Sequence, residues 1–194
     1  MTLKAVVAGL GGRGVLFTTR LIAEAAREKN HPVLASETHG MSQRGGSVVS
    51  YLKIGPASSP MMRMGTADLL LGLERIEALK YLPFLKVKGW AVINTSERAI
   101  GDRELAGALE RRQISLRLVD GDGEALMIGS PVSANMVLLG YLSTLPIPYI
   151  EEMDLYRAVK SLSPPSRLES NLRAFERGIE LARNDRGVIW KESW

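Results

Sequence analysis

The sequence predicts an α/β fold with three layers, in which helices cover both faces of a central sheet. Short apolar runs of valine, leucine and isoleucine alternate with segments of helical periodicity over most of the chain, the pattern of a mostly parallel sheet. The first apolar run leads through a glycine-rich turn directly into a helical segment. Residues 47–54 follow the second expected strand without an intervening helix, so we expect at least one antiparallel pairing.

The first part of the chain contains the glycine turn and three expected strands. Residues 3–8 are a short apolar run, and residues 15–27 carry apolar side chains at helical spacing. Residues 31–36 form the second expected strand, and Pro32 marks its beginning because a missing N–H group costs least there. In residues 47–54, successive side chains form two alternating sets that would face opposite sides of a sheet, as expected of a third strand.

The rest of the chain continues the alternation of strands and helices. Strands are predicted at residues 69–73, 90–94 and 115–119. Helical periodicity predicts helices at residues 76–82, 103–112, 124–128, 135–143, 150–161 and 166–184. Asp102 is the expected N-cap of the second of these helices. No repeat or linker interrupts the pattern, so residues 1–194 are expected to form a single domain with a Rossmann-like α/β/α architecture.

The composition excludes several kinds of site. The chain contains no cysteine, which rules out disulfides, thiolate zinc sites, a cysteine nucleophile and cysteine-ligated iron–sulfur clusters. His31 and His39 are the only histidines, which is too few for a histidine-rich metal site. Any electron carrier that works with this chain must therefore lie on another chain or be an organic cofactor.

Charge and hydropathy limit the expected partners. The net charge of +4 comes from basic residues interspersed with acids, which falls short of the clustered basic face that binds nucleic acid. No run approaches the roughly 20 apolar residues that span a bilayer. The N-terminal residues run at once into an apolar strand and lack the features of a signal peptide. We expect a cytoplasmic protein with neither a nucleic-acid nor a membrane partner.

The turn after the first strand is the first candidate site. It consists of Gly9, Leu10, Gly11, Gly12, Arg13 and Gly14, which satisfies G-x-G-x-x-G between a strand and a helix. Glycines there permit a tight turn and let backbone N–H groups approach a phosphate. Glu37 lies at the end of the second strand, where dinucleotide-binding proteins place the acid that holds a ribose. The turn is either a nucleotide or phosphate site or only a tight turn. Arg13 either binds an anion or projects into solvent, and a side chain at Gly12 is expected to clash.

The polar segment of residues 37–48 is the second candidate site. It contains Glu37, His39, Gly40, Ser42, Gln43, Arg44, Gly45 and Gly46. Loops of this composition are rarely selected for packing alone, and glycines beside an arginine are typical of an anion-binding concavity. His39 either exchanges a proton near neutral pH or caps a strand end, and Arg44 either binds an anion or pairs with a carboxylate such as Glu37. For the segment as a whole we favour a functional or interface role.

Together the two segments resemble a known family. A turn of the form G-x-G-G-x-G followed by E-x-H-G-M-S-Q-R-G-G-S-V is similar to the gamma-type domain of 2-oxoacid:ferredoxin oxidoreductases, in particular to indolepyruvate oxidoreductase beta subunits. The resemblance covers nearly the whole chain. It extends to residues 65–72, Glu74, Glu77, Asn94, residues 135–140 and residues 171–178. This chain departs from the family at Arg13, where relatives usually have glutamine.

The resemblance implies a role within a complex. Enzymes of this family oxidatively decarboxylate a 2-oxoacid, form an acyl-CoA and pass electrons to ferredoxin. Thiamine diphosphate and the iron–sulfur clusters then belong to a large partner subunit. The isolated chain is expected to be inactive and to carry neither a catalytic residue nor a metal ligand. The implied contact surface for coenzyme A phosphates or for the catalytic subunit comprises Gly9, Gly11, Gly12, Arg13, Gly14, Glu37, His39, Gly40, Ser42, Gln43, Arg44, Gly45, Gly46 and Asn135.

Two other interpretations stay open on the residues alone. The chain could be an independent NAD(P)-binding protein that uses the glycine turn, or a scaffolding subunit in which that turn is only structural. The identity of the 2-oxoacid is not predicted, because its binding site is expected near the thiamine cofactor on another chain.

Overall fold

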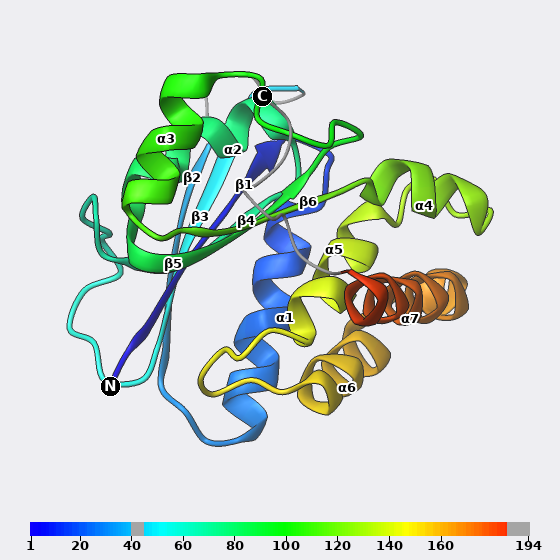
Figure 1. The fold of residues 1–194 in the computed structure, drawn as a ribbon. Helices are drawn as coiled ribbons and strands as arrows, with labels where there is room; N and C mark the ends of the chain where they lie inside the picture. The colour runs from blue at the N-terminus through cyan, green and yellow to red at the C-terminus, as the bar shows by residue number, and fades with distance from the viewer. Residues whose placement is uncertain (40–44, 186–194) are drawn as a thin grey trace.

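A computed structural model describes residues 1–39 and 45–185, which form a six-stranded sheet between two layers of helices (Figure 1). The strands are β1 (Leu3–Leu10), β2 (Val33–His39), β3 (Ser47–Ile54), β4 (Ala67–Gly72), β5 (Leu85–Asn94) and β6 (Ser115–Val119), in the spatial order β2-β3-β1-β4-β5-β6. Strands β1, β4, β5 and β6 are parallel neighbours, whereas β3 is antiparallel to both β2 and β1. The predicted α/β/α fold, mostly parallel with antiparallel pairing, is confirmed.

Helices cover the two faces of the sheet unequally. They are α1 (Val15–Glu28), α2 (Arg75–Tyr81), α3 (Arg103–Arg111), α4 (Gly121–Met127), α5 (Ala134–Ser143), α6 (Glu152–Leu162) and α7 (Leu168–Asn184), with short 3₁₀ segments η1 (Leu82–Phe84) and η2 (Pro165–Arg167). Helices α1, α5, α6 and α7 lie on one face, and α2 and α3 lie on the other (Figure 1). Each face has its own apolar core, around Ile22, Leu138 and Phe175 on the first and Ala78 and Leu109 on the second.

Differences from the predicted elements arise where strand pairing overrides side-chain polarity. The second strand begins at Val33, just after Pro32, and continues to His39 because each polar residue near its end has a register partner on β3. Strand β5 begins at Leu85, earlier than predicted, because Leu85 pairs with Ala67 of β4 at an irregular step in the register. Ladder hydrogen bonds join backbone groups, so the hydrophobic pattern does not report these extensions.

Helix α5 packs against α7 through a close approach of the two backbones. All ten residues of α5 are buried. A Cβ atom at Gly140 would lie 1.9 Å from the carbonyl oxygen of Phe175, and one at Gly178 would lie 1.9 Å from that of Val137. Two of the segments that resemble the family end in these glycines, residues 135–140 and 171–178. The two segments therefore meet where α5 crosses α7.

Two carboxylates are buried and hydrogen-bonded, one on each side of the sheet. Glu77 is 6% exposed and accepts hydrogen bonds from Ser47 and Lys80. Asp154 is 3% exposed and forms an ion pair with Lys29. Burial acts to raise the pKa of each carboxyl. Hydrogen bonds from Lys80 and Ser47 to Glu77, and from Lys29 to Asp154, lower the pKa by more than burial raises it. The net pKa of both groups is lowered.

Acid is therefore expected to destabilise the fold through these two groups. A lowered pKa in the folded state contributes stability that is fully present above the unfolded-state pKa, 4.5 for Glu77 and 3.8 for Asp154, and is lost as the pH falls through the folded-state value. Urea unfolding at pH 7, 4.5 and 3 checks this, with the Glu77→Gln/Asp154→Asn double variant as the comparison. The double variant should be less stable at pH 7 and lose less stability towards pH 3. An unchanged pH dependence in that variant contradicts the assignment.

Candidate functional site

The glycine turn joins β1 to α1 at the carboxyl edge of the sheet. The N–H group of Arg13 donates to the carbonyl oxygen of Leu10 at 3.1 Å, which closes the turn. Gly12 and Gly14 have φ values of +92° and +86°, in the left-handed region that favours glycine. The carbonyl oxygen of Gly14 then accepts the first α1 hydrogen bond, from Thr18 at 2.9 Å.

Tight packing surrounds two of the turn glycines and leaves a third in the open. A Cβ atom at Gly14 would lie 2.5 Å from Nδ2 of Asn135, which itself donates to Thr18 at 3.2 Å. A Cβ atom at Gly9 would lie 3.1 Å from Val15. At Gly12 it would meet no atom within 4 Å, so the expected clash at this position is wrong. Backbone strain from the positive φ is the reason for glycine there, and Asn135 supports the turn from behind.

Substitution of the two left-handed glycines should separate strain from clash. Gly12→Ala is expected to lower the free energy of unfolding by about 1 kcal/mol, the cost of a left-handed non-glycine residue. Gly14→Ala should cost roughly 3 kcal/mol, because its Cβ also displaces Asn135. Urea unfolding of both variants measures the difference, and equal losses contradict the steric account of Gly14.

Arg13 is held by an ion pair across the carboxyl edge. Its guanidinium contacts both carboxylate oxygens of Asp122, at 2.8 and 3.1 Å, and the two side chains are 41% and 45% exposed. Asn94, at the end of β5, donates to the same carboxylate at 2.8 Å and to the carbonyl oxygen of Leu73 at 3.2 Å. Its own Oδ1 accepts the N–H group of Gly121 at 3.0 Å. Arg13 thus neither projects freely into solvent nor presents an unneutralised charge.

Asp122 is a residue of the candidate site that the sequence prediction did not identify. It follows β6 within a short acidic, glycine-containing stretch, residues 120–123, and so lies at the carboxyl end of the last strand of the sheet. That position is the signal that could have identified it, because the carboxyl ends of parallel strands gather at one edge of the sheet.

The described parts of the two candidate segments lie side by side at that edge. Strand β3 begins between the ends of β1 and β2, with Leu10 opposite Ser47 and His39 opposite Val48. The N–H group of Gly11 donates to the carbonyl oxygen of Gly46 at 2.9 Å, which joins the glycine turn to the residues just before β3. Gly45 is exposed with a φ of +74°. Gly40, Ser42, Gln43 and Arg44 lie outside the described residues.

Glu37 does not lie on a strand next to β1. It is on β2, opposite Ser50 of β3, and β3 separates it from β1. Neighbouring strands are spaced by ~4.8 Å, so β2 runs roughly 10 Å from β1. In dinucleotide-binding folds the acidic residue lies on the strand next to the glycine turn. This strand order disfavours the independent NAD(P)-binding interpretation.

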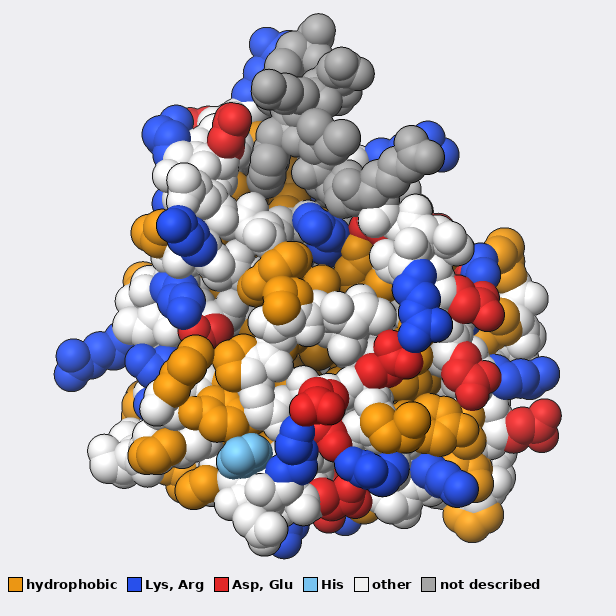
Figure 2. Space-filling view, turned by 60° about the horizontal axis from the view of Figure 1, so that its bottom comes forward, with side chains coloured by type: hydrophobic (Ala, Val, Ile, Leu, Met, Phe, Trp, Pro, Cys, Tyr) orange, Lys and Arg blue, Asp and Glu red, His pale blue; other side chains and the backbone are white. Residues whose placement is uncertain are grey.

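Within residues 1–39 and 45–185, no group of three or more His, Asp or Glu side chains could hold a metal ion. No helix of the same part of the chain is long and apolar enough to cross a membrane. Over the right half of the face in Figure 2, basic and acidic side chains are interspersed.

Solved structures share this fold. The keto/oxoacid ferredoxin oxidoreductase gamma subunit of Geobacter sulfurreducens PCA superposes with a TM-score of 0.73 at 24% identity, covering 94% of this chain and 99% of that one. The 2-oxoglutarate:ferredoxin oxidoreductase of Magnetococcus marinus superposes with a TM-score of 0.76 at 21% identity. That match covers 96% of this chain but 32% of the other, so the fold there is one part of a longer chain.

Curated relatives match over almost their whole length. The indolepyruvate oxidoreductase subunit IorB of Methanothermobacter thermautotrophicus is 34% identical, with 94% of this chain and 98% of the relative covered. IorB of Thermococcus kodakarensis is 32% identical, with 94% and 97% covered. The 2-oxoglutarate synthase subunit KorC of Methanothermobacter marburgensis is 25% identical, with 90% and 94% covered. The model of the pyruvate ferredoxin/flavodoxin oxidoreductase family matches residues 4–181. The chain therefore belongs to the pyruvate ferredoxin/flavodoxin oxidoreductase family.

Proposed function

We propose that this chain is the cluster-free subunit of an indolepyruvate-type 2-oxoacid:ferredoxin oxidoreductase. The observation that carries the proposal is the match to IorB along nearly the full length of both chains. Identity falls from 34% with an IorB subunit to 25% with a KorC subunit, which favours an arylpyruvate-type complex over a 2-oxoglutarate-type one. With no cysteine, the chain leaves cluster ligation to a larger partner subunit.

In this proposal the chain supports chemistry that takes place elsewhere in a cytoplasmic complex. Thiamine diphosphate on the large subunit supplies the carbanion chemistry for oxidative decarboxylation, and the clusters of that subunit pass electrons to ferredoxin. The carboxyl edge is the working surface of this chain. Its glycine turn, Gly9–Gly14, and residues 37–46 meet either coenzyme A phosphates or the large subunit. The hydrogen bond between Gly11 and Gly46 supports this proposal, because it joins the glycine turn to the residue just before β3.

Recovery of the native partner tests the proposal. The tagged chain is purified from its own cells, and co-purifying proteins are identified by mass spectrometry. A cysteine-rich, thiamine-diphosphate-dependent large subunit is the expected partner, and the purified complex should oxidise indolepyruvate faster than 2-oxoglutarate. Recovery of the chain alone with a bound dinucleotide would support the independent NAD(P)-binding interpretation instead.

Asp122→Asn distinguishes the two candidate occupants of the carboxyl edge. An exposed ion pair of this kind contributes about 0.5–1 kcal/mol, so its loss should free Arg13 for an anion at a gain of roughly two- to fivefold in affinity. If coenzyme A phosphates approach the turn, the KM for coenzyme A of the assembled complex falls by that factor, and the effect shrinks at high salt. Arg13→Gln in the same complex is the control, because it removes the ion pair with Asp122 and also the guanidinium that would bind the anion. An unchanged KM in Asp122→Asn assigns this edge to subunit contact alone.

A further inference from the structure

Glu77 is a buried carboxylate whose two oxygens are both occupied. It lies on α2 at 6% exposure. The hydroxyl of Ser47 donates to Oε2 at 2.6 Å, and the ammonium of Lys80 donates to Oε1 at 2.6 Å. Ser47 is the first residue of β3, so one bond of this carboxylate links α2 to the beginning of a strand. Hydrogen bonds to a charged acceptor are about twice as strong as neutral ones.

Helix α2 offers Glu77 a fixed support. A Cβ atom at Gly72 of β4 would lie 2.2 Å from Cβ of Ala78, so the helix rests directly on the sheet beside Glu77. The carboxylate of Glu74 caps the helix by accepting the N–H group of Glu77 at 2.9 Å. Close packing and the cap together limit how far the Glu77 side chain can shift relative to the sheet.

The link continues from Ser47 to the glycine turn. Gly46 directly precedes Ser47, and its carbonyl oxygen accepts the N–H group of Gly11 at 2.9 Å. Gly45 and Gly46 lack side chains that restrict their backbone. The hydroxyl of Ser47 is therefore the nearest side-chain anchor for the carbonyl group that holds Gly11.

We propose that Glu77 is a positioning residue, which holds the Gly9–Gly14 turn in place through Ser47 and Gly46. In this arrangement the carboxylate contacts no ligand. It fixes the backbone of Gly46, and that backbone fixes the N–H group of Gly11 at the carboxyl edge. The functional consequence rests on the proposed function of that edge, whereas the structural link can be measured in the chain alone.

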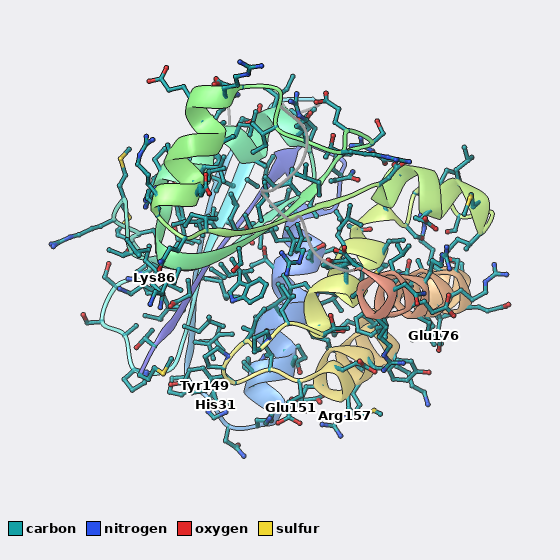
Figure 3. The ribbon with its side chains drawn as sticks, viewed as in Figure 1. His31, Lys86, Tyr149, Glu151, Arg157 and Glu176 are labelled. Atoms are coloured by element: carbon teal, nitrogen blue, oxygen red, sulfur yellow. The ribbon has the colours of Figure 1, made fainter. Side chains whose placement is uncertain are left out.

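Asp154 provides a matched control. It is also a buried carboxylate with a lysine partner, Lys29, and it accepts the N–H group of Glu151 at 3.0 Å. Lys29 directly follows the last residue of α1, whereas the glycine turn directly precedes its first residue. Glu151 and Arg157, which both contact Asp154, lie at the bottom of Figure 3. A helix of 14 residues is ~21 Å long, so Asp154 acts far from the turn.

Amide hydrogen exchange in the full chain tests the link directly. The variants are Ser47→Ala, Ser47→Thr, Glu77→Gln and Asp154→Asn, followed residue by residue by NMR. Ser47→Ala should speed exchange at Gly11 by about tenfold, since one hydrogen bond to a charged group is lost. Ser47→Thr keeps the hydroxyl and should restore wild-type exchange. Glu77→Gln keeps one acceptor oxygen but loses the charge, so it should speed exchange at Gly11 less than Ser47→Ala does. Asp154→Asn should change exchange near Lys29 and not at Gly11. Equal exchange at Gly11 in Ser47→Ala and the wild type, or an equal effect of Asp154→Asn, overturns the proposal.

The assembled complex then separates positioning from general destabilisation. Wild-type chain is combined with the large subunit, and turnover is measured against coenzyme A and ferredoxin. Ser47→Ala should raise the KM for coenzyme A or the dissociation constant of the subunits by roughly tenfold with little change in kcat, and Ser47→Thr should reverse this. Asp154→Asn should change neither constant. If the wild-type chain does not support turnover, the proposed function fails, and the exchange data still decide the structural link.

Discussion

Gly178→Ala is expected to lower the free energy of unfolding by about 4 kcal/mol or more, a large part of the 5–15 kcal/mol typical of a domain. Alanine favours a helix over glycine by about 1 kcal/mol, but the steric cost reverses that gain. The new Cβ would lie 1.9 Å from the carbonyl oxygen of Val137 and 2.7 Å from the N atom of Tyr141. Both are backbone atoms of α5, so only separation of the two helices relieves the contact. Separation would also loosen Phe175, the largest fully buried side chain among the described residues.

Gly107→Ala is the matched control for this prediction. Gly107 lies within α3, and a Cβ there would meet only the end of the flexible Arg111 side chain, at 3.4 Å. The substitution should therefore stabilise the chain by about 0.5–1 kcal/mol through helix propensity. Thermal and urea unfolding of both variants measure the contrast. Similar effects of the two substitutions contradict the close-approach account of α5 and α7.

Asn94→Ala is expected to destabilise the chain by about 3 kcal/mol, because it removes three hydrogen bonds and leaves buried groups unpaired. Asn94 is 4% exposed and binds the carbonyl oxygen of Leu73, the N–H group of Gly121 and the carboxylate of Asp122. Its loss should also release the Arg13–Asp122 pair from the sheet edge.

Thr95→Ala is the control for this prediction, because Thr95 is the next residue in the chain and has a less buried side chain. The hydroxyl of Thr95 accepts one hydrogen bond, from the N–H group of Glu97 at 3.1 Å, in a partly exposed place. We expect a loss of at most about 1 kcal/mol from that variant. Equilibrium unfolding in urea distinguishes the two substitutions. A loss below 1 kcal/mol in Asn94→Ala means that water replaces its three partners, and the network then does not hold the carboxyl edge together.

The sequence predicted which segments form strands and helices better than it predicted which strands are neighbours in the sheet. Periodicity identified the strands and helices, because it reports which side chains face a core, and the spacing of glycines identified the turn. It predicted an antiparallel pairing for residues 47–54 but not that this strand would lie between β1 and β2. Pairing is a property of backbone groups distant in the sequence, and the hydrophobic pattern does not encode it. That one placement moves Glu37 away from the glycine turn and brings Gly46 to it.

Side-chain partners at the candidate site were the least predictable feature. Arg13 was expected to face an anion or solvent, whereas it pairs with Asp122, which is 109 residues away in the sequence. A side chain at position 12 was expected to clash, whereas the space beside Gly12 is open and its positive φ is what favours glycine there. Asn135 was placed at the contact surface, whereas it is 8% exposed and packs behind Gly14. Such contacts depend on the relative position of elements, which local patterns do not fix.

The most direct test of the central claim is reconstitution of 2-oxoacid oxidation from separately produced subunits. The large thiamine-diphosphate and iron–sulfur subunit from the same organism is assayed for coenzyme A-dependent reduction of ferredoxin by indolepyruvate, with and without this chain. We predict that the two chains form a stable complex and that turnover requires both. Full turnover by the large subunit alone, with no association of this chain, would contradict the assignment of this chain as a subunit of the enzyme.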